Sequence, residues 1–296
     1  MDLDSFLVAV YVMGDDWCQD HGARTPREPG RPPTLSMSAV LTLALVAQWP
    51  RWRSERDFWR FAQAHLRPYF PRLGSQSQLN RRIRAAEPAL RAVHAALVAP
   101  LVSVPSVYHV LDTTLIPAVV RVRACRHGLF AGQASFGRCV SKTEWVYGFK
   151  VALCVTPAGV ITSFGLAPAA CDERPIGDAL LAAERHAAYL ADKGYASGSW
   201  ERHWQQAYGA VVAATPNANT RRAWPQAACR WAAGHRQVIE QVIAQLKDLF
   251  ALERHRAKTL GGLLARLAAK VTAFTAGAWL NARLGRPLRH LADLLV

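Results

Sequence analysis

The sequence is short of acidic side chains, and in its first third it is short of lysine. Only 21 Asp and Glu residues stand against 36 Lys and Arg in 296 residues, which gives a formal net charge of +15. The first 100 residues contain 13 Arg and no Lys. Because guanidinium groups bind phosphate in a bidentate manner, this imbalance favours nucleic acid as a partner over a merely solvated basic surface.

The cysteines follow no regular pattern. No CxxC pair occurs among the six, so the sequence does not have the framework of a disulfide-stapled domain or of a common zinc module. Cys125, His127 and Cys139 are conceivable metal ligands, but their spacing fits no common zinc site. We expect free, structural thiols in a reducing cytoplasm at the six positions, Cys18, Cys125, Cys139, Cys154, Cys171 and Cys229.

The sequence also shows neither the pattern of a targeting signal nor that of a membrane span. The chain opens with the acidic stretch "MDLDSF" instead of a basic segment followed by an apolar core. The long uncharged run before Asp112 is interrupted by His94, Pro100 and Pro105, which suits a helix and a linker better than a span. We therefore expect a cytoplasmic protein without a membrane partner.

Residues 1–104 are predicted to form a small all-helical domain. The Pro- and Gly-rich stretch "GARTPREPGRPPTLS" separates a first short helix from "AVLTLALVAQW", for which Ser36 or Ser38 supplies the N-cap. Ser54 and Ser75 are positioned to begin two further helices. The last helix starts with several polar and basic residues, so it is either a helix-turn-helix-like DNA reader or part of a plain bundle with a basic face. These residues are Gln76, Gln78, Asn80, Arg81, Arg82 and Arg84.

Residues 105–296 change to strand-forming sequence and predict an α/β domain with a helical C-terminal tail. "YHVLDTTLIP" is a β-rich run, and "WVYGFKVALCVTP" with "GVITSFGLAP" reads as a hairpin. Helix and strand patterns then alternate up to "AVVAATP", before a loop expected over 217–234. The order of elements mixes an antiparallel meander with αβ units, which predicts a mixed sheet flanked by helices.

The segment "HRQVIEQVIAQLKDLF" predicts an amphipathic helix with charges beside its buried stripe. Arg236, Glu240 and Lys247 lie along one edge of that stripe at helical spacing. Such an arrangement is either a partly buried salt bridge or part of a functional site. The stripe itself consists of Ile239, Val242, Ile243, Leu246 and Phe250.

Three acids stand at the ends of predicted elements. Asp112 lies in an apolar strand, Asp192 follows the strand "AYLA", and Glu240 lies on the amphipathic helix. If they converge, their oxygen atoms suit Mg²⁺ or Mn²⁺, and two such ions activate a nucleophile and stabilise a leaving oxygen in phosphodiester cleavage. Each acid also has a structural reading as a turn cap or an ion-pair partner, and composition does not choose among them. Nearby acids are rivals for the same role: Asp172, Glu173 and Asp178.

The order of motifs resembles that of bacterial insertion-sequence transposases with a DDE catalytic domain. "LDTTLIP" resembles the strand of the first Asp, "LADKGY" the second-Asp motif, and "RQVIEQVIAQLK" the signature in which an Arg precedes the catalytic Glu and a Lys follows it. The signature also has a tyrosine where this chain has Ala233. The resemblance covers roughly residues 105–280. "LSMSAVLTLAL" and "YFPRLGSQSQLNRRI" also resemble the start of one subgroup.

The resemblance implies a ribonuclease-H-like fold and a divalent-metal site. Asp112, Asp192 and Glu240 would be the catalytic metal ligands for Mg²⁺ or Mn²⁺, as two ions, and no organic cofactor is implied. The resemblance also implies DNA contacts at Arg236 and Lys247. Further DNA contacts are expected at other basic residues, namely Arg81, Arg82, Arg84, Lys150 and Lys193.

The same resemblance implies an enzyme that acts on double-stranded DNA. It would bind the inverted repeats at the ends of its element, hydrolyse DNA there, and join the freed 3′-hydroxyl to a target. Because two ends must meet, we expect a homodimer on DNA, associated with the bacterial nucleoid. The alternatives are a ribonuclease-H-like nuclease without strand transfer and an inactive, domesticated transposase that only binds DNA.

Overall fold

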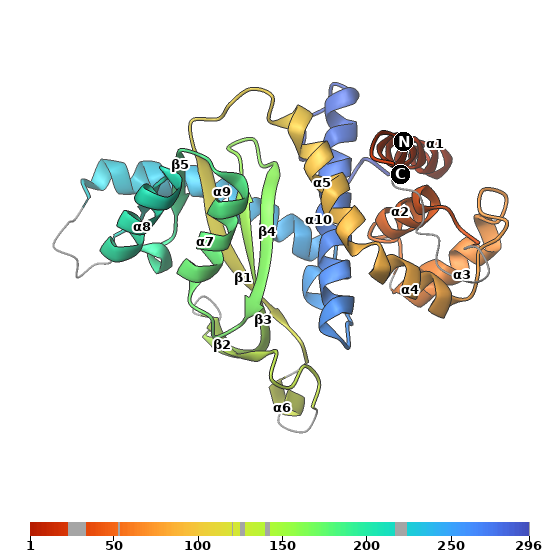
Figure 1. Ribbon diagram of the computed structural model, residues 1–296, viewed down its shortest axis with the longest axis horizontal. Coiled ribbons are helices and arrows are strands. Elements are labelled where there is room, and N and C mark those ends of the chain that lie inside the picture. The colour runs from red at the N-terminus through yellow and green to blue at the C-terminus, as the bar shows by residue number, and fades with distance from the viewer. Residues whose placement is uncertain are drawn as a thin grey trace. The chain divides into compact units, whose positions relative to one another are not determined.

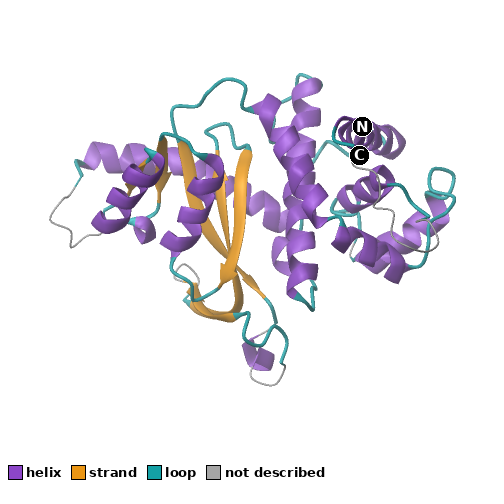
Figure 2. Ribbon diagram, viewed as in Figure 1, coloured by secondary structure: helices purple, strands orange, loops and turns teal. Residues whose placement is uncertain are grey.

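A computed structural model describes residues 1–22, 34–52, 54–119, 121–124, 128–139, 143–216 and 224–295. The chain divides into two compact units (Figures 1 and 2). Unit 1 is helical, and unit 2 is built around a sheet. Unit 1 comprises residues 1–100, 248–255 and 261–296, and unit 2 comprises residues 101–247 and 256–260. The C-terminal segment therefore belongs to the same unit as the N-terminal helices. The division into functional domains at residues 1–104 and 105–296 remains a prediction.

Side-chain caps begin the helices of unit 1. Ser36 and Ser54 accept hydrogen bonds from the backbone N–H three residues on, and Ser75 forms a capping box with Gln78. Ser36, and not Ser38, is therefore the cap of its helix. The helices are α1 (Leu3–Asp20), α2 (Met37–Val46), α3 (Glu55–His65), α4 (Gln76–Ala85), α5 (Glu87–Leu101), the 3₁₀ helix η2 (Leu252–Arg254) and α10 (Leu260–Arg283).

The single helix predicted after Ser75 is two helices. It is interrupted at Ala86, between α4 and α5. Pro88 lies in the first turn of α5, where a residue without a backbone N–H is tolerated, whereas inside a continuous helix it would remove a hydrogen bond.

Helix α10 is buried on every side at its centre. All residues from 267 to 278 are buried, including Lys270, Thr272 and Thr275. Thr272 donates to the carbonyl oxygen of Leu90 at 3.0 Å, so the buried hydroxyl has a partner. By length and composition α10 could cross a membrane, but 83% of its most apolar stretch is buried inside the protein, as in a core helix.

Unit 2 contains a six-stranded mixed sheet in the order β2-β3-β1-β5-β6, with β4 also paired to β3. Strand β1 runs antiparallel to β3 and parallel to β5, and β6 continues the parallel part. The strands are β1 (His109–Pro117), β2 (Ser135–Cys139), β3 (Glu144–Val155), β4 (Ile161–Pro168), β5 (Ala188–Ala191) and β6 (Val211–Ala214). The helices of this unit are α6 (Arg121–Ala124), α7 (Glu173–Glu184), α8 (Gly198–Tyr208), α9 (Gln226–Asp248) and the 3₁₀ helix η1 (Lys193–Tyr195).

Three antiparallel strands followed by two parallel strands, which are reached through α7 and α8, make a ribonuclease-H-like fold. The predicted fold class is confirmed. Residues of β1, β3, α7 and α8 form one core, which contains Leu111, Cys154, Leu181 and Trp204. Figure 1 shows α7 in front of the strands and α9 behind them.

Two local predictions for unit 2 were wrong. The loop expected over 217–234 is helical from Gln226 onward, because Pro225 is followed by the alanine-rich segment "QAACRWAA", which favours helix. Residues 217–223 lie outside the described part of the chain. Strand β2 was not expected, since its short sequence "SFGRC" contains a glycine and pairs only with the first part of β3.

Candidate active site

The sheet register places two of the predicted acids side by side. Strands β1 and β5 are parallel, and Leu111 pairs with Ala191, so Asp112 and Asp192 follow at the next position of neighbouring strands. Leu111 and Ala191 face the core under α7 and α8. Because side chains alternate along a strand, the two aspartates face the opposite side, where α9 lies.

Arg236 from α9 bridges these aspartates. Its Nη1 atom donates to Oδ1 of Asp192 at 3.0 Å, and its Nη2 atom lies 3.7 Å from Oδ2 of Asp112. The Nε–H group of Arg236 is buried and has no hydrogen-bond acceptor within the described part of the chain. The guanidinium therefore contacts two carboxylates with a single positive charge while one of its donors stays unsatisfied, which is costly in a purely structural ion pair.

The carboxyl group of Asp112 is held where ionisation is unfavourable. Burial raises the pKa of Asp112 to about 7, and the nearby carboxylates of Asp192 and Glu173 act in the same direction. The backbone N–H of Thr113, which donates to Oδ1 at 2.7 Å, and Arg236 oppose this shift. A buried acid whose pKa is raised by burial and by neighbouring carboxylates is typical of a functional site.

Glu173 lies at the same end of the sheet. It is in the first turn of α7 and accepts a hydrogen bond from the hydroxyl of Thr113 at 2.9 Å. A Cβ atom at Gly194 would overlap its Oε2 atom, so the glycine allows this carboxylate to approach the backbone that follows Asp192. Lys150, whose Nζ is 3.5 Å from Oε1 of Glu173, partly balances the charge.

Glu240, the third predicted acid, is exposed on α9 one turn after Arg236. Lys247 is half-buried on the same helix three turns after Arg236. The stripe beside them is buried at Ile239, Val242 and Leu246, as predicted, and half-buried at Ile243. The structure thus brings together Asp112, Asp192 and Arg236 by direct contacts, and places Glu240 next to this group by helical spacing alone.

An exposed aromatic cluster stands one turn before Arg236. Trp231 is 50% exposed and stacks on His235, with ring centroids 4.2 Å apart. Tyr108, which directly precedes β1, packs edge-on against both rings at 5.8 Å. The sequence signal for this cluster was the spacing of Trp231 and His235 at i and i+4, but Tyr108 is distant in sequence.

A comparison with known families decides what this arrangement belongs to. Residues 104–260, more than half of the chain, match the family described as transposase DDE domain. The chain is a DDE-domain transposase. No curated protein matches it. The matched segment of the transposase contains Asp112, Asp192, Arg236, Glu240 and Lys247.

Besides Arg236, two other basic residues predicted to contact DNA already have partners within the transposase. Lys150 donates to the carbonyl oxygen of Cys171 at 2.8 Å, in addition to its pairing with Glu173. Arg82 of α4 donates to the carbonyl oxygen of Leu35 at 2.9 Å. Both side chains therefore have a structural role, whereas Lys193 is exposed beside Asp192.

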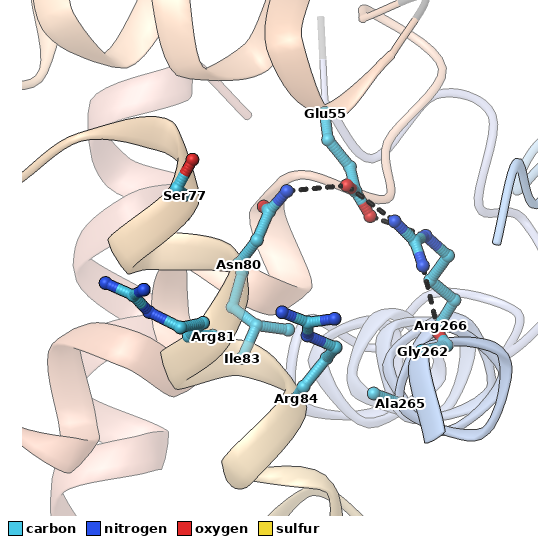
Figure 3. A pocket seen from close by; sticks show the side chains of 9 residues that line it. All are labelled: Glu55, Ser77, Asn80, Arg81, Ile83, Arg84, Gly262, Ala265 and Arg266. Carbon is cyan, nitrogen blue, oxygen red and sulfur yellow. Dashed lines mark hydrogen bonds and ion pairs between the residues drawn. The ribbon is translucent and has the colours of Figure 1, made fainter. Parts of the chain in front are cut away.

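The other two N-terminal arginines line a pocket of about 250 Å³ in unit 1, outside the matched segment (Figure 3). Arg266 of α10 pairs with Glu55 at 2.6 Å, and Asn80 donates to the same carboxylate at 3.1 Å. Arg81 and Arg84 are exposed, and Figure 3 shows Arg84 directed toward the Glu55–Arg266 pair while Arg81 extends away. With three guanidinium groups and one carboxylate, the lining carries a positive charge.

Proposed function

We propose that this transposase binds the terminal inverted repeats of its element and carries out divalent-metal-dependent hydrolysis and strand transfer at the DNA ends. The observation that carries the proposal is the parallel register of β1 and β5, which sets Asp112 beside Asp192 under Arg236. An active site of this kind needs acidic oxygen atoms side by side on adjacent strands, with a phosphate-binding cation nearby.

The donor set fits Mg²⁺ or Mn²⁺. Carboxylate oxygens are the ligands that both ions prefer, and a metal cation bound here would favour the ionised form of Asp112, whose pKa burial raises to about 7. Asp112, Asp192 and Glu240 would hold the metal through their carboxylate oxygens. Bound metal would supply activation of a water or 3′-hydroxyl nucleophile and stabilisation of the leaving oxygen.

The third ligand is assigned to Glu240 on the signature and on its position one turn after Arg236, and Glu173 is the acid that competes for this role. The charge of Glu173 acts on Asp112 and raises its pKa. The Glu173 carboxylate, however, already accepts a hydrogen bond from Thr113 and pairs with Lys150. Arg236 would move from the aspartates to a DNA phosphate once a metal neutralises them. Lys247 and the exposed Lys193 would bind phosphates on either side of the cleavage point.

Recognition of the DNA ends is assigned to two further surfaces. The basic lining of the unit 1 pocket, with Arg81 and Arg84, would bind backbone phosphates near α4. The exposed Trp231, next to Arg236, offers an aromatic face on which a base can stack. Because two ends must be joined to one target, we propose that the active species on DNA is a homodimer.

The test is cleavage and joining of a labelled element end by matched variants in Mg²⁺. Asp112→Asn, Asp192→Asn and Glu240→Gln should each abolish both activities while DNA affinity and fold are preserved. Glu201→Gln, a change of an exposed acid on α8, is the control and should act like the wild type. Strand transfer is read from products in which the donor 3′-end is linked to target DNA.

Glu173→Gln separates the two candidates for the third acid. If it cleaves DNA normally and Glu240→Gln does not, the assignment to Glu240 holds. The reverse result would move the third ligand to Glu173. Cleavage by the wild type without any joined product would replace the transposase mechanism by that of a nuclease.

A further inference from the structure

A second cluster of metal-ligating side chains lies on the other face of the sheet from Asp112. His109 of β1, Cys154 of β3 and Glu184 of α7 each present one donor atom, and these atoms lie within 4.8 Å of one another. Sγ of Cys154 is 3.9 Å from Nδ1 of His109 and 3.5 Å from Oε1 of Glu184. The same Nδ1 and Oε1 atoms are hydrogen-bonded to each other. The proposed catalytic residues are not part of this cluster.

The cluster is built into the core and does not lie on the surface. His109 and Cys154 are buried, and the Glu184 side chain is only 11% exposed. Three ionisable groups in an apolar core are costly unless they are paired or bind a metal. The three elements that carry them are far apart in sequence and are brought together only by the sheet and the helix packed on it.

Neighbouring groups fix the carboxylate in the orientation that a ligand requires. The hydroxyl groups of Thr162 and Ser163 donate to Oε2 of Glu184 at 2.6 and 2.9 Å, which leaves Oε1 directed at His109 and Cys154. The His109 ring stacks on His186, with centroids 4.0 Å apart. Such second-layer contacts orient the ligands in metal sites and restrict their rotation.

We propose that His109, Cys154 and Glu184 form a structural Zn²⁺ site. A nitrogen, a sulfur and a carboxylate oxygen are a donor set that zinc accepts, and tetrahedral bond lengths place sulfur about 3.5–3.6 Å from each of the other two donors. The observed 3.5 and 3.9 Å are close to these values. Only the His109–Glu184 contact has to open, by rotation of one carboxylate, with a water as the fourth ligand.

A Zn²⁺ ion suits this place by its charge and by the donor types. Bound by the Cys154 thiolate, the Glu184 carboxylate and a neutral His109 imidazole, after displacement of the thiol proton, the ion would complete a site of zero net charge, as a buried site requires. Mg²⁺ lacks affinity for thiolate and is not expected to compete.

The site would tie together strands β1 and β3 and the end of α7. His109 is three residues before Asp112 on β1, so the ion would stabilise the strand that carries the first proposed catalytic acid. The proposal does not depend on the proposed transposition activity, because its readouts are metal content, absorption and stability.

The experiment uses the full-length chain, without a histidine tag, produced in medium supplemented with Zn²⁺ or Co²⁺ and measured in excess Mg²⁺. The wild type should contain one Zn²⁺ per chain. Its Co²⁺ form should show a thiolate-to-metal charge-transfer band in the near ultraviolet. Cys154→Ser should lose the band and the bound ion. Cys171→Ser, which changes a half-buried free thiol outside the cluster, should retain both.

Two further variants cover the case in which Cys154→Ser does not fold. Glu184→Gln should also lose the ion, and Thr162→Val should weaken Zn²⁺ affinity about tenfold or more by freeing the carboxylate. A wild-type protein without stoichiometric zinc and without the Co²⁺–thiolate band would overturn the proposal. So would retention of the band in Cys154→Ser.

Discussion

Burial of the Asp112 carboxyl group lowers the stability of the folded protein whenever this group is ionised. Its pKa is raised from 3.8 to about 7, with burial as the largest cause. Between about pH 4 and 7 the folded protein therefore holds one more proton at this site than the unfolded chain does. The free energy of unfolding falls as pH rises through this window, and it remains lowered above pH 7.

We predict that Asp112→Asn stabilises the protein without metal at about pH 8, by up to roughly 4 kcal/mol, and has little effect at about pH 4. The amide has no charge to bury, so its benefit exists only where the aspartate would be ionised. Chemical denaturation at both pH values, in the presence of a chelator, measures the difference.

Added Mg²⁺ should stabilise the wild type and not Asp112→Asn. Asp20→Asn at the exposed end of α1 serves as the control and should show neither effect. A stabilisation that is the same at both pH values would show that burial of the charge is not its cause.

Arg81 and Arg82 are neighbours with different tasks. Arg82 donates to the carbonyl oxygen of Leu35, whereas Arg81 is exposed. We predict that Arg82→Ala lowers the free energy of unfolding by about 1–3 kcal/mol, because it removes a hydrogen bond from a charged donor. Arg81→Ala should change it by less than about 0.5 kcal/mol. Urea unfolding of the two variants decides this, and equal effects would contradict the assignment.

At the scale of elements, α10 contains a lysine in its buried centre. The pKa of Lys270 is lowered to about 8 from 10.5, mainly by burial, and its ammonium group donates to the carbonyl oxygen of Phe250. The unfolded chain holds an extra proton between about pH 8 and 10.5, so stability rises with pH in this window. At neutral pH the full cost of the buried charge is present.

Lys270→Met should therefore raise the free energy of unfolding at about pH 7, by roughly 1–2 kcal/mol once the missing hydrogen bond is subtracted. The gain should shrink as pH rises above about 8, since neutral lysine no longer carries the cost. Thermal unfolding at several pH values tests this, with the exposed Lys258→Met as the matched control. If the gain in the free energy of unfolding is independent of pH, it arises from better packing of the methionine and not from removal of the buried charge.

Elements with local signals were predictable from the sequence. Ser54 and Ser75 begin helices because a serine cap acts within three residues. The hairpin of β3 and β4 follows from alternating apolar residues around a turn. The all-round burial of α10 was not predictable, since its composition alone does not say how many neighbours surround it.

The candidate site could also be predicted from the sequence only in part. Asp112 and Asp192 could be chosen only through a resemblance, and the physical reason for their meeting, the β1–β5 register, exists only in the folded sheet. The engagement of Arg82 and Lys150 by backbone carbonyls also depends on tertiary contacts. Cys125 and His127, which are conceivable metal ligands by residue type, lie outside the described residues.

At the scale of the whole molecule, basic residues are divided between two units with different proposed tasks. Unit 2 contains the acids and Arg236, while unit 1 contains the pocket lined by Arg81 and Arg84. If end recognition depends on unit 1 and chemistry on unit 2, then the two can be impaired separately. Weak binding and slow catalysis would then arise from different substitutions.

We predict that Arg81→Ala combined with Arg84→Ala weakens binding to element ends and makes its salt dependence shallower. Removal of one arginine–phosphate interaction should reduce the slope of log affinity against log salt by about 0.9, hence by roughly 2 for the pair. At saturating DNA, cleavage by this double variant should stay near the wild-type rate, because Asp112, Asp192 and Glu240 are unchanged. Fluorescence anisotropy across a salt series and single-turnover cleavage measure the two quantities.

The control removes the same charge elsewhere, by Arg72→Ala combined with Arg202→Ala, two exposed arginines outside the pocket. General electrostatic attraction alone would make both double variants lose affinity and slope equally, because only total charge would matter. Specific phosphate binding at the pocket requires that the Arg81–Arg84 pair lose clearly more. An unchanged slope in that pair would leave the pocket as part of the helical scaffold and move end recognition to another surface of the transposase.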